Sequence, residues 1–362
     1  MEKRRSPVLS KHTVQRWDLD KTYLDTDTES LRGLLRIPFE RARDKRALPG
    51  VAALVKALRR SNTSRGMTTS VNFVTASPPQ IGGAIREKLS LDGIEIDEIR
   101  FKNQMHHLLR GHFEALREHV GFKLSELMQS VRAGRRDGEE LLFGDDWESD
   151  ALVYSLYADI CEGRISWAHL EQVLEKVGVQ DAAYLQSIRD ALHRTGPRRR
   201  VRAICILRAR RRPAGELEAF GERLYWFDSY LECALILHSL GNLDAHGVVE
   251  VAAASDAGPD LVRVAFESTA RRWPRLRREH LTLARKALVQ AELMEPVAPG
   301  SVFLRGYVRW RARRGRSPMP MRDDAPPLPN YDQLAAQWSR RARREREREQ
   351  ERDAMPVQES HE

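Results

Sequence analysis

The sequence has little cysteine and lacks any long uncharged apolar run, and both absences narrow the class of protein. Only 3 of the 362 residues are cysteine. Because Cys161, Cys205 and Cys233 have apolar neighbours and no short spacing, we expect small core residues in a reducing compartment, not a disulfide or zinc set. No uncharged apolar run approaches the roughly 18 residues of a membrane-spanning helix.

A leader sequence is not evident either. The N-terminus reads Met-Glu-Lys-Arg-Arg, with no apolar stretch behind it. We therefore expect a soluble, cytoplasmic protein with at most peripheral contact to membranes. The 61 Lys and Arg residues outnumber 52 Asp and Glu residues, for a net charge of +9. This balance favours anionic partners such as phosphate, acidic lipid or nucleic acid, and selects none of them.

Hydrophobic patterning predicts an α/β protein. Short β-rich segments alternate with segments that carry apolar residues at helical spacing, which is typical of a doubly wound parallel sheet. The predicted strands are 13–17, 71–74, 94–101, 141–143 and 201–207. The predicted helices are 51–58, 78–89, 104–119, 124–131, 151–161, 169–192 and 217–240, the last with a core of aromatic residues.

The chain is long enough for two domains, or for one domain with appendages. We expect the main domain to cover residues 1–245, with a helical insertion at about 165–197 before the last strand of the sheet. Residues 246–312 are predicted to form a helical extension. Residues 313–362 combine a proline-rich linker with an Arg/Glu-rich tail that is either disordered or a solvated single helix.

Two carboxylates one residue apart, Asp18 and Asp20, follow the first predicted strand. In an extended chain their side chains project from the same face. Exposed in a turn, the two acids would simply be solvated. At the carboxyl end of a buried strand, their repulsion raises one pKa or calls for a cation between them. Such strand ends are where open α/β sheets bind ligands.

Other polar residues fall at the ends of later elements. Thr75 ends the second strand and is followed by Ala76, Ser77 and Pro78, where serine and proline are expected to start a helix. Lys123 leads into a predicted helix. Asp145, Asp146 and Asp150 follow the strand at 141–143.

In this order, the segments resemble the four motifs of the haloacid dehalogenase (HAD) superfamily of phosphohydrolases, over roughly residues 13–165. The closer resemblance is to the catalytic domain of the actin-patch-type phosphatidate phosphatases. It is carried by Val74-Thr75-Ala76-Ser77-Pro78, by the Gly144-Asp145-x4-Asp150 spacing and by Gly163-Arg164-Ile165. Lys21 departs from the family pattern, which more often has a small or acidic residue after the second aspartate.

The resemblance implies a HAD-like fold with a small cap or none, and a role for each matched residue. Asp18 is the nucleophile that forms an aspartyl-phosphate, and Asp20 is the general acid and base. Mg2+ is held by Asp18, the main-chain carbonyl of Asp20, and Asp145. Lys123 holds nucleophile and phosphate together. The phosphate cradle is Thr75 and Ala76, and the residues placed behind these groups are Thr22, Asp146 and Asp150.

These roles imply a Mg2+-dependent phosphatase, with phosphatidate or a related phospholipid as the first substrate. Residues 25–47 are long enough for only a small flap. The site would then be open, and an open site suits a bulky phosphorylated substrate. A phosphatase of nucleic-acid ends or phosphoproteins is the alternative of the same class. A catalytically silent binding module, using arginines such as those at 198–212, is the alternative of a different class. His106, His107, His112 and His119 lack the spacing of a metal site, so we expect them to be solvated or capping residues.

Overall fold

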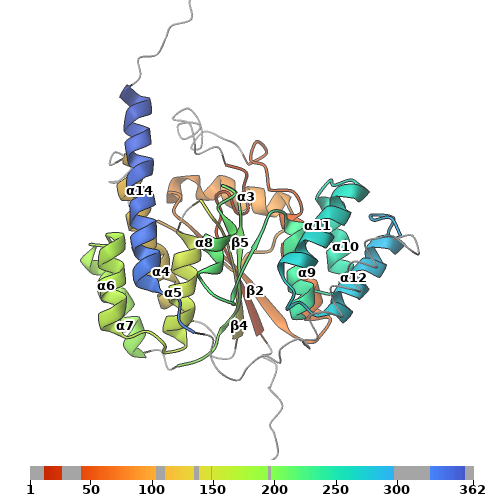
Figure 1. Cartoon of the computed structure of the whole chain (residues 1–362), viewed down its shortest axis with the longest axis horizontal. Helices are drawn as coiled ribbons and strands as arrows, with labels where there is room; N and C mark the ends of the chain where they lie inside the picture. Colours follow the sequence, from red (N-terminus) through yellow and green to blue (C-terminus); the bar gives the residue numbers. More distant parts are fainter. Residues whose placement is uncertain are drawn as a thin grey trace, which may run out of the picture.

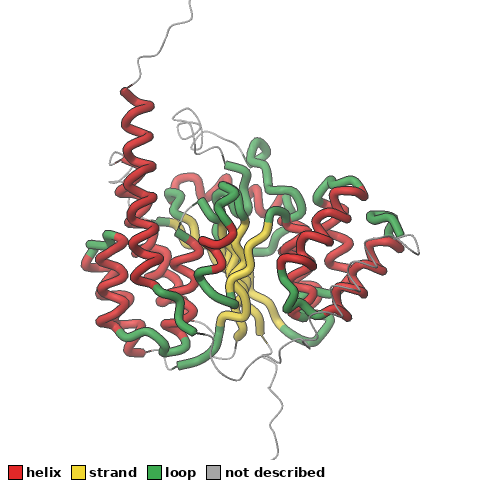
Figure 2. Tube along the Cα trace, viewed as in Figure 1, coloured by secondary structure: helices red, strands yellow, loops and turns green. Residues whose placement is uncertain are grey.

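A six-stranded parallel sheet lies at the centre of the computed structural model (Figure 2). The structure describes residues 12–26, 42–102, 111–133, 138–147, 149–194, 197–296 and 327–354. The strands are β1 (His12–Trp17), β2 (Thr68–Thr75), β3 (Glu98–Phe101), β4 (Gly138–Asp145), β5 (Val201–Leu207) and β6 (Leu224–Phe227). Their order, β3-β2-β1-β4-β5-β6, is Rossmann-like, and every neighbouring pair is parallel. The predicted α/β fold class is confirmed.

Helices cover both faces of the sheet, as a doubly wound fold requires. They are α2 (Val51–Thr63), the 3-10 turn η2 (Pro79–Ile81), α3 (Gly82–Leu91), α4 (Gly111–Ala133), α5 (Asp150–Cys161), α6 (Trp167–Val177), α7 (Ala182–Arg194), α8 (Ala214–Glu218), α9 (Tyr230–Leu240), α10 (Ala245–Ala254), α11 (Pro259–Arg272), α12 (Arg278–Gln290) and α14 (Tyr331–Ala354). Figure 1 shows α4 to α7 and α14 on one side and α9 to α12 on the other.

The central strands carry side chains that are buried on both faces. In β4, Leu141, Leu142 and Phe143 are all buried, which explains why this run is continuously apolar and does not alternate. The Trp17 ring at the end of β1 stacks on the Phe143 ring with centroids 3.7 Å apart. This contact fixes the carboxyl ends of β1 and β4 side by side.

Residues 217–240 were expected to be mostly helical, but the stretch also contains a strand that the prediction missed. Leu224, Tyr225, Trp226 and Phe227 form β6, so β5 is not the last strand of the sheet. All four side chains are buried, and so short an apolar run fits a buried strand or a buried helix equally well from its sequence. Ser229, whose hydroxyl accepts a hydrogen bond from the Glu232 amide, starts α9 after it.

Two other helix boundaries differ from the prediction. Residues 111–133 form one helix, so Lys123 lies inside α4 rather than ahead of a helix. α4 runs through Gly121, where a Cβ would lie 2.9 Å from Val179, so the glycine lets α4 pack closely against the segment after α6. The predicted helix 169–192 is divided into α6 and α7 at Gly178, whose φ of 84° is left-handed and ends α6.

The charged C-terminal run forms α14, and its first turns are not solvated as we expected. Tyr331, Leu334, Ala335 and Trp338 are buried, and α14 packs on α6 and α4. The Tyr331 hydroxyl donates to the carboxylate of Asp159 on α5. Residues 27–41 and 297–326 lie outside the described residues. Most of the predicted flap, part of the predicted helical extension and most of the predicted linker fall in these ranges. The division into domains stays a prediction.

Cys161, Cys205 and Cys233 are all buried, as expected of core residues. Burial raises the pKa of the Cys161 thiol to about 12. None of the helices in the described part of the chain combines the length and the apolar content that crossing a lipid bilayer requires.

A buried ion pair links β1 to β4 inside the sheet. Arg16 donates to Glu140 at 2.8 Å and 3.3 Å, and both side chains are at least 95% buried. Arg200 and the Tyr157 hydroxyl also donate to Glu140. Burial alone would raise the pKa of Glu140, but Arg16 holds it below its ordinary range. This contribution to stability is therefore present at neutral pH and is lost as the pH falls through the lowered pKa.

Removing Glu140 will cost far more stability than removing a surface acid. Glu140→Ala leaves two buried guanidinium groups without their carboxylate, so we expect the free energy of unfolding to fall by about 3–5 kcal/mol. Urea denaturation at pH 7 measures this. Glu95→Ala, at an exposed ion pair with Arg59, is the control and should change stability little. Equal small losses in both variants would contradict the account.

Candidate metal centre

Four of the predicted site residues meet at the carboxyl ends of β1 and β4. Asp18 directly follows β1, and its amide donates to the Phe143 carbonyl of β4 at 2.9 Å. Asp145 is the last residue of β4, and Asp150 is the first residue of α5. Lys123 reaches this point from the middle of α4. All four side chains are buried.

Lys123 lies between two of the carboxylates. Its ammonium nitrogen is 2.8 Å from Asp18 Oδ1 and 2.7 Å from Asp150 Oδ1. The other oxygen of Asp150 accepts the Asp145 amide at 3.3 Å. Charge-assisted contacts of this length in a buried site are strong, and they fix both carboxylates relative to α4.

The three carboxylates form a group that can hold a metal ion. One oxygen from each of Asp18, Asp145 and Asp150 lies within 4.8 Å of the others. If all three are ionised, the Lys123 ammonium leaves two negative charges in a buried site, which is costly without a cation. Oxygen donors with this charge fit a hard divalent cation such as Mg2+ or Ca2+. The chemistry of the donor set therefore agrees with a metal centre.

Two neighbours orient the Asp145 carboxylate. The Thr22 hydroxyl donates to its Oδ2 at 3.2 Å, and the Trp147 amide donates to its Oδ1 at 2.6 Å. The Thr22 carbonyl in turn accepts the Tyr230 hydroxyl. Burial raises the pKa of Tyr230 well above its ordinary value, so this phenol stays a neutral donor at neutral pH.

Gly144 is required by the position of Asp150. A Cβ on Gly144 would lie 2.3 Å from Asp150 Oδ2 and 2.6 Å from its Cβ. The absence of a side chain therefore lets the first turn of α5 approach β4. The Gly144-Asp145-x4-Asp150 spacing has a steric reason in this structure.

Asp20 does not join the carboxylate group. Its carboxylate accepts hydrogen bonds from the hydroxyls of Thr26, Thr75 and Ser77 at 3.0, 3.2 and 2.7 Å. Thr75 also accepts the Ser77 amide, so the loop after β2 turns around Asp20, with Ala76 between the two hydroxyls in sequence. Asp20 thus lies on the β2 side of the centre.

Ser77 was expected to cap a helix, and this was wrong. The cap residue of η2 is Pro78, and its side chain makes no capping hydrogen bond. The Ser77 hydroxyl is used on Asp20 instead. Two hydroxyls one residue apart at a strand end were the available signal for this second role.

Asp146 contacts the loop after β5 and is not in the group of three carboxylates. Its carboxylate accepts the backbone amides of Arg210 and Arg212 at 2.7 and 2.9 Å, in the loop after β5. These contacts tie the loop after β4 to the loop after β5. A role for Asp146 behind the metal ligands stays a prediction.

Two positively charged side chains lie over the Trp147 ring beside the metal centre, and the sequence analysis did not predict this contact. The Lys21 ammonium lies 3.7 Å from its ring centroid, and the Arg210 guanidinium carbon lies 3.4 Å from it. Both distances are within cation–π range. Lys21 itself has a left-handed φ of 57°. The residues come from three separate loops, so no local pattern could have joined them.

The histidines give no sign of a second metal site in the part of the chain that the structure describes. His119 belongs to α4 and is in none of the groups of three acidic, His or Cys ligands found there. His106 and His107 lie outside the described residues, and the side chain of His112 does too.

No protein-family model, no curated protein and no solved structure matches this chain. Its class is therefore defined by the fold and the site alone. It is a parallel α/β protein with a buried group of aspartates, at adjacent strand ends, that can hold a metal ion.

Metal affinity should depend on the buried aspartates. We expect Asp145→Asn to weaken Mg2+ binding at least about tenfold, because it removes a charged oxygen ligand. Isothermal titration calorimetry with Mg2+ measures this. Asp260→Asn removes the same charge from an exposed position on α11 and should leave affinity unchanged. Similar affinities in both variants would mean that Asp145 is not a ligand.

The steric role of Gly144 gives a separate test. Gly144→Ala should displace Asp150 and weaken Mg2+ binding, because its Cβ has no room. Gly83→Ala is the matched control, since a Cβ there meets nothing within 4 Å. Both variants are to be checked for folding by circular dichroism. Native affinity in folded Gly144→Ala would show that the approach of α5 to β4 does not position the site.

Proposed function

We propose that the protein is a Mg2+-dependent phosphatase of the HAD type, which hydrolyses a phosphate monoester through an aspartyl-phosphate. The observation that carries this proposal is the contact of Lys123 with both Asp18 and Asp150, next to Asp145. An amine held against a carboxylate at a strand end is suited to bring an anionic nucleophile and an anionic phosphate together.

Asp18 is the proposed nucleophile. One of its carboxylate oxygens attacks phosphorus, the bond from phosphorus to the leaving oxygen breaks, and an aspartyl-phosphate forms on Asp18. Lys123, 2.8 Å from Asp18, holds the carboxylate in place and offsets the charge of the incoming phosphate. When bound, Mg2+ neutralises further charge on the phosphate oxygens.

Asp20 is the proposed acid and base. It donates a proton to the leaving oxygen, and then takes a proton from the water that attacks the aspartyl-phosphate and releases inorganic phosphate. The hydroxyls of Thr75 and Ser77 donate hydrogen bonds to Asp20. We propose that they hold its carboxyl group and, when substrate enters, donate to the phosphate oxygens instead. The Ala76 amide is proposed to complete this phosphate cradle.

The metal ligands are proposed to be Asp18, Asp145 and the main-chain carbonyl of Asp20. Asp150 belongs to the same acidic group, and its two oxygens contact the Lys123 ammonium and the Asp145 amide. We therefore assign Asp150 to the orientation of Lys123 and of the β4 end. Mg2+ uses one or two carboxylates and keeps several waters, which agrees with two acidic ligands.

Phosphatidate or a related phospholipid is the first substrate that we propose. The proposal rests on the sequence resemblance, and the overall positive charge supports an acidic surface as a partner. Contact with membranes would then be peripheral, in a cytoplasmic protein.

A phosphatase of nucleic-acid ends is the second candidate, and one observation favours it. Lys21, in the loop after β1, and Arg210, in the loop after β5, place two positive charges against the Trp147 ring beside the site. A substrate with phosphates next to the one that is hydrolysed would be attracted there more strongly than an isolated monoester. Phosphoproteins are the other substrate of this same-class alternative. A catalytically silent binding module would bind an anionic partner through the same two positive charges, without hydrolysing it.

Loss of the nucleophile separates an enzyme from a binding module. Asp18→Asn should lower the hydrolysis of 4-nitrophenyl phosphate by more than about 10^3-fold. Chelation of Mg2+ should abolish the native activity, and Asp260→Asn should retain it. Turnover in folded Asp18→Asn equal to that of the native protein would exclude Asp18 as nucleophile, and no turnover in the native protein on any substrate would favour the binding module.

The substrate candidates are separated by a side-by-side panel of phosphatidate vesicles and 3′-phosphorylated oligonucleotides. Faster turnover of the oligonucleotides would overturn the lipid proposal. If neighbouring phosphates bind at Trp147, Lys21→Ala should raise the KM for oligonucleotides about fivefold and flatten its salt dependence. Lys286→Ala, an exposed lysine on α12, should not. Equal effects of the two variants would remove the role of Lys21.

A further inference from the structure

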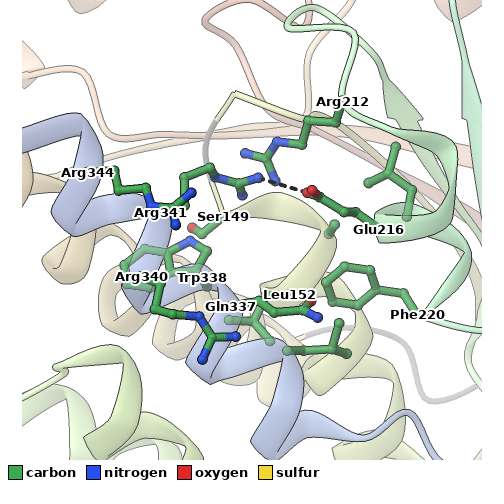
Figure 3. A pocket seen from close by; sticks show the side chains of 13 residues that line it. Ser149, Leu152, Arg212, Glu216, Phe220, Gln337, Trp338, Arg340, Arg341 and Arg344 are labelled. Carbon is green, nitrogen blue, oxygen red and sulfur yellow. Dashed lines mark hydrogen bonds and ion pairs between the residues drawn. The ribbon is translucent and has the colours of Figure 1, made fainter. Parts of the chain in front are cut away.

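A cavity of about 400 Å³ lies between the start of α5, the short helix α8 and the packed part of α14 (Figure 3). It is separate from the group formed by Asp18, Asp145 and Asp150, none of which lines it. Its volume is within the range of small-molecule pockets, roughly 300–1,000 Å³. The proposed phosphatase chemistry does not use it.

Arginine dominates the polar part of the cavity wall. Arg212 comes from the loop after β5, and Arg340, Arg341 and Arg344 come from α14. The acidic residue among the lining side chains is Glu216, which pairs with Arg341 at 3.2 Å (Figure 3). Four arginines and one glutamate among the lining residues leave an excess of positive charge. Guanidinium groups present paired donors that suit phosphate and carboxylate oxygens.

Ser149 adds a buried hydroxyl with no protein partner in the described residues. It is the cap residue of α5 and is 98% buried, yet its side chain makes no capping hydrogen bond and its oxygen has no partner. A buried hydroxyl left without a partner costs stability. Ser149 lines the cavity together with Ala151 and Leu152 of the first turn of α5. The positive end of the α5 dipole therefore opens on the same space.

The cavity wall also has apolar parts. Leu152, Phe220 and Trp338 contribute hydrophobic or aromatic surface (Figure 3), and Leu217 lines the cavity as well. An inorganic ion would leave this surface uncovered. A molecule that joins an anionic group to an apolar or planar body would contact both parts of the wall.

We propose that this cavity is a second binding site, for an organic phosphate whose phosphate group meets the arginines and Ser149 and whose apolar body lies against Phe220 and Trp338. A nucleotide and an alkyl phosphate share this chemistry. The site does not depend on the catalytic assignment, because none of its lining residues takes part in that chemistry.

The site is physically connected to the metal centre. The Arg212 guanidinium donates to the Trp147 carbonyl at 3.2 Å, and the Arg212 amide donates to Asp146. The same short loop after β4 carries Asp145 at one end and Ser149 at the other. A bound phosphate would therefore contact the end of the loop that positions Asp145.

Binding is tested by calorimetry with ADP and, separately, with dodecyl phosphate below its micelle concentration. The full-length Asp18→Asn protein is used, so that neither probe is turned over. We expect at least one probe to bind with a Kd below about 1 mM. Binding of ADP alone would identify a nucleotide-type ligand, and binding of dodecyl phosphate alone would identify a lipid-type ligand. Absence of binding by both probes would overturn the proposal.

Variants locate the binding. In the same background, Arg340→Glu with Arg344→Glu should weaken binding at least about tenfold, because two attractive charges become repulsive. Arg343→Glu makes the same change on the same helix at an exposed residue outside the cavity wall, and should weaken binding less than about twofold. Equal weakening in both would place the probe elsewhere.

Ser149→Ala keeps the test independent of folding. Because the hydroxyl has no hydrogen-bond partner among the described residues, its removal should not lower the unfolding temperature, but should weaken the binding of the probe severalfold. Unchanged binding in this variant, together with unchanged binding in the double arginine variant, would contradict the site. Activity of the native enzyme decides the phosphatase proposal separately, so the two proposals can fail independently.

Discussion

The contact of Lys123 with Asp18 and Asp150 is the interaction on which the site depends. It joins three separate elements, the end of β1, the middle of α4 and the start of α5, through one buried ammonium group. A buried ion pair is expensive to desolvate, and it is tolerated when its remaining donors and acceptors are also satisfied. Asp150 meets this condition, since its second oxygen accepts the Asp145 amide.

The parallel sheet explains how these groups come together. All six strands have their carboxyl ends at the same edge, and β1 and β4 are neighbours at its centre. Residues more than 120 positions apart in the chain therefore become adjacent, as Thr22 and Asp145 do. Gly144 then permits α5 to start against β4, which brings Asp150 to the same point. The strand order therefore brings Asp18 and Asp145 together, and the absence of a side chain at Gly144 leaves space for Asp150.

Five of the six strands, and the position of Asp18 and Asp145 at strand ends, could be predicted from the sequence because they leave local signals. Buried central strands appear as apolar runs, and Asp18 and Asp145 stand directly at their ends. The strand β6 was missed, since four large apolar residues have no period that separates a strand from a helix. Asp146 and Trp147 could not be placed because their partners, Arg210 among them, come from a different loop. Only the tertiary structure brings those loops together.

The central claim is that the buried aspartates hold one divalent cation beside Lys123. Anomalous diffraction from a crystal soaked in Mn2+ tests this most directly, because it locates the ion without relying on activity. The account predicts an anomalous peak within about 2.5 Å of carboxylate oxygens of Asp18 and Asp145. A fully soaked crystal with no peak at this position, or with peaks only at other acidic residues, would contradict it.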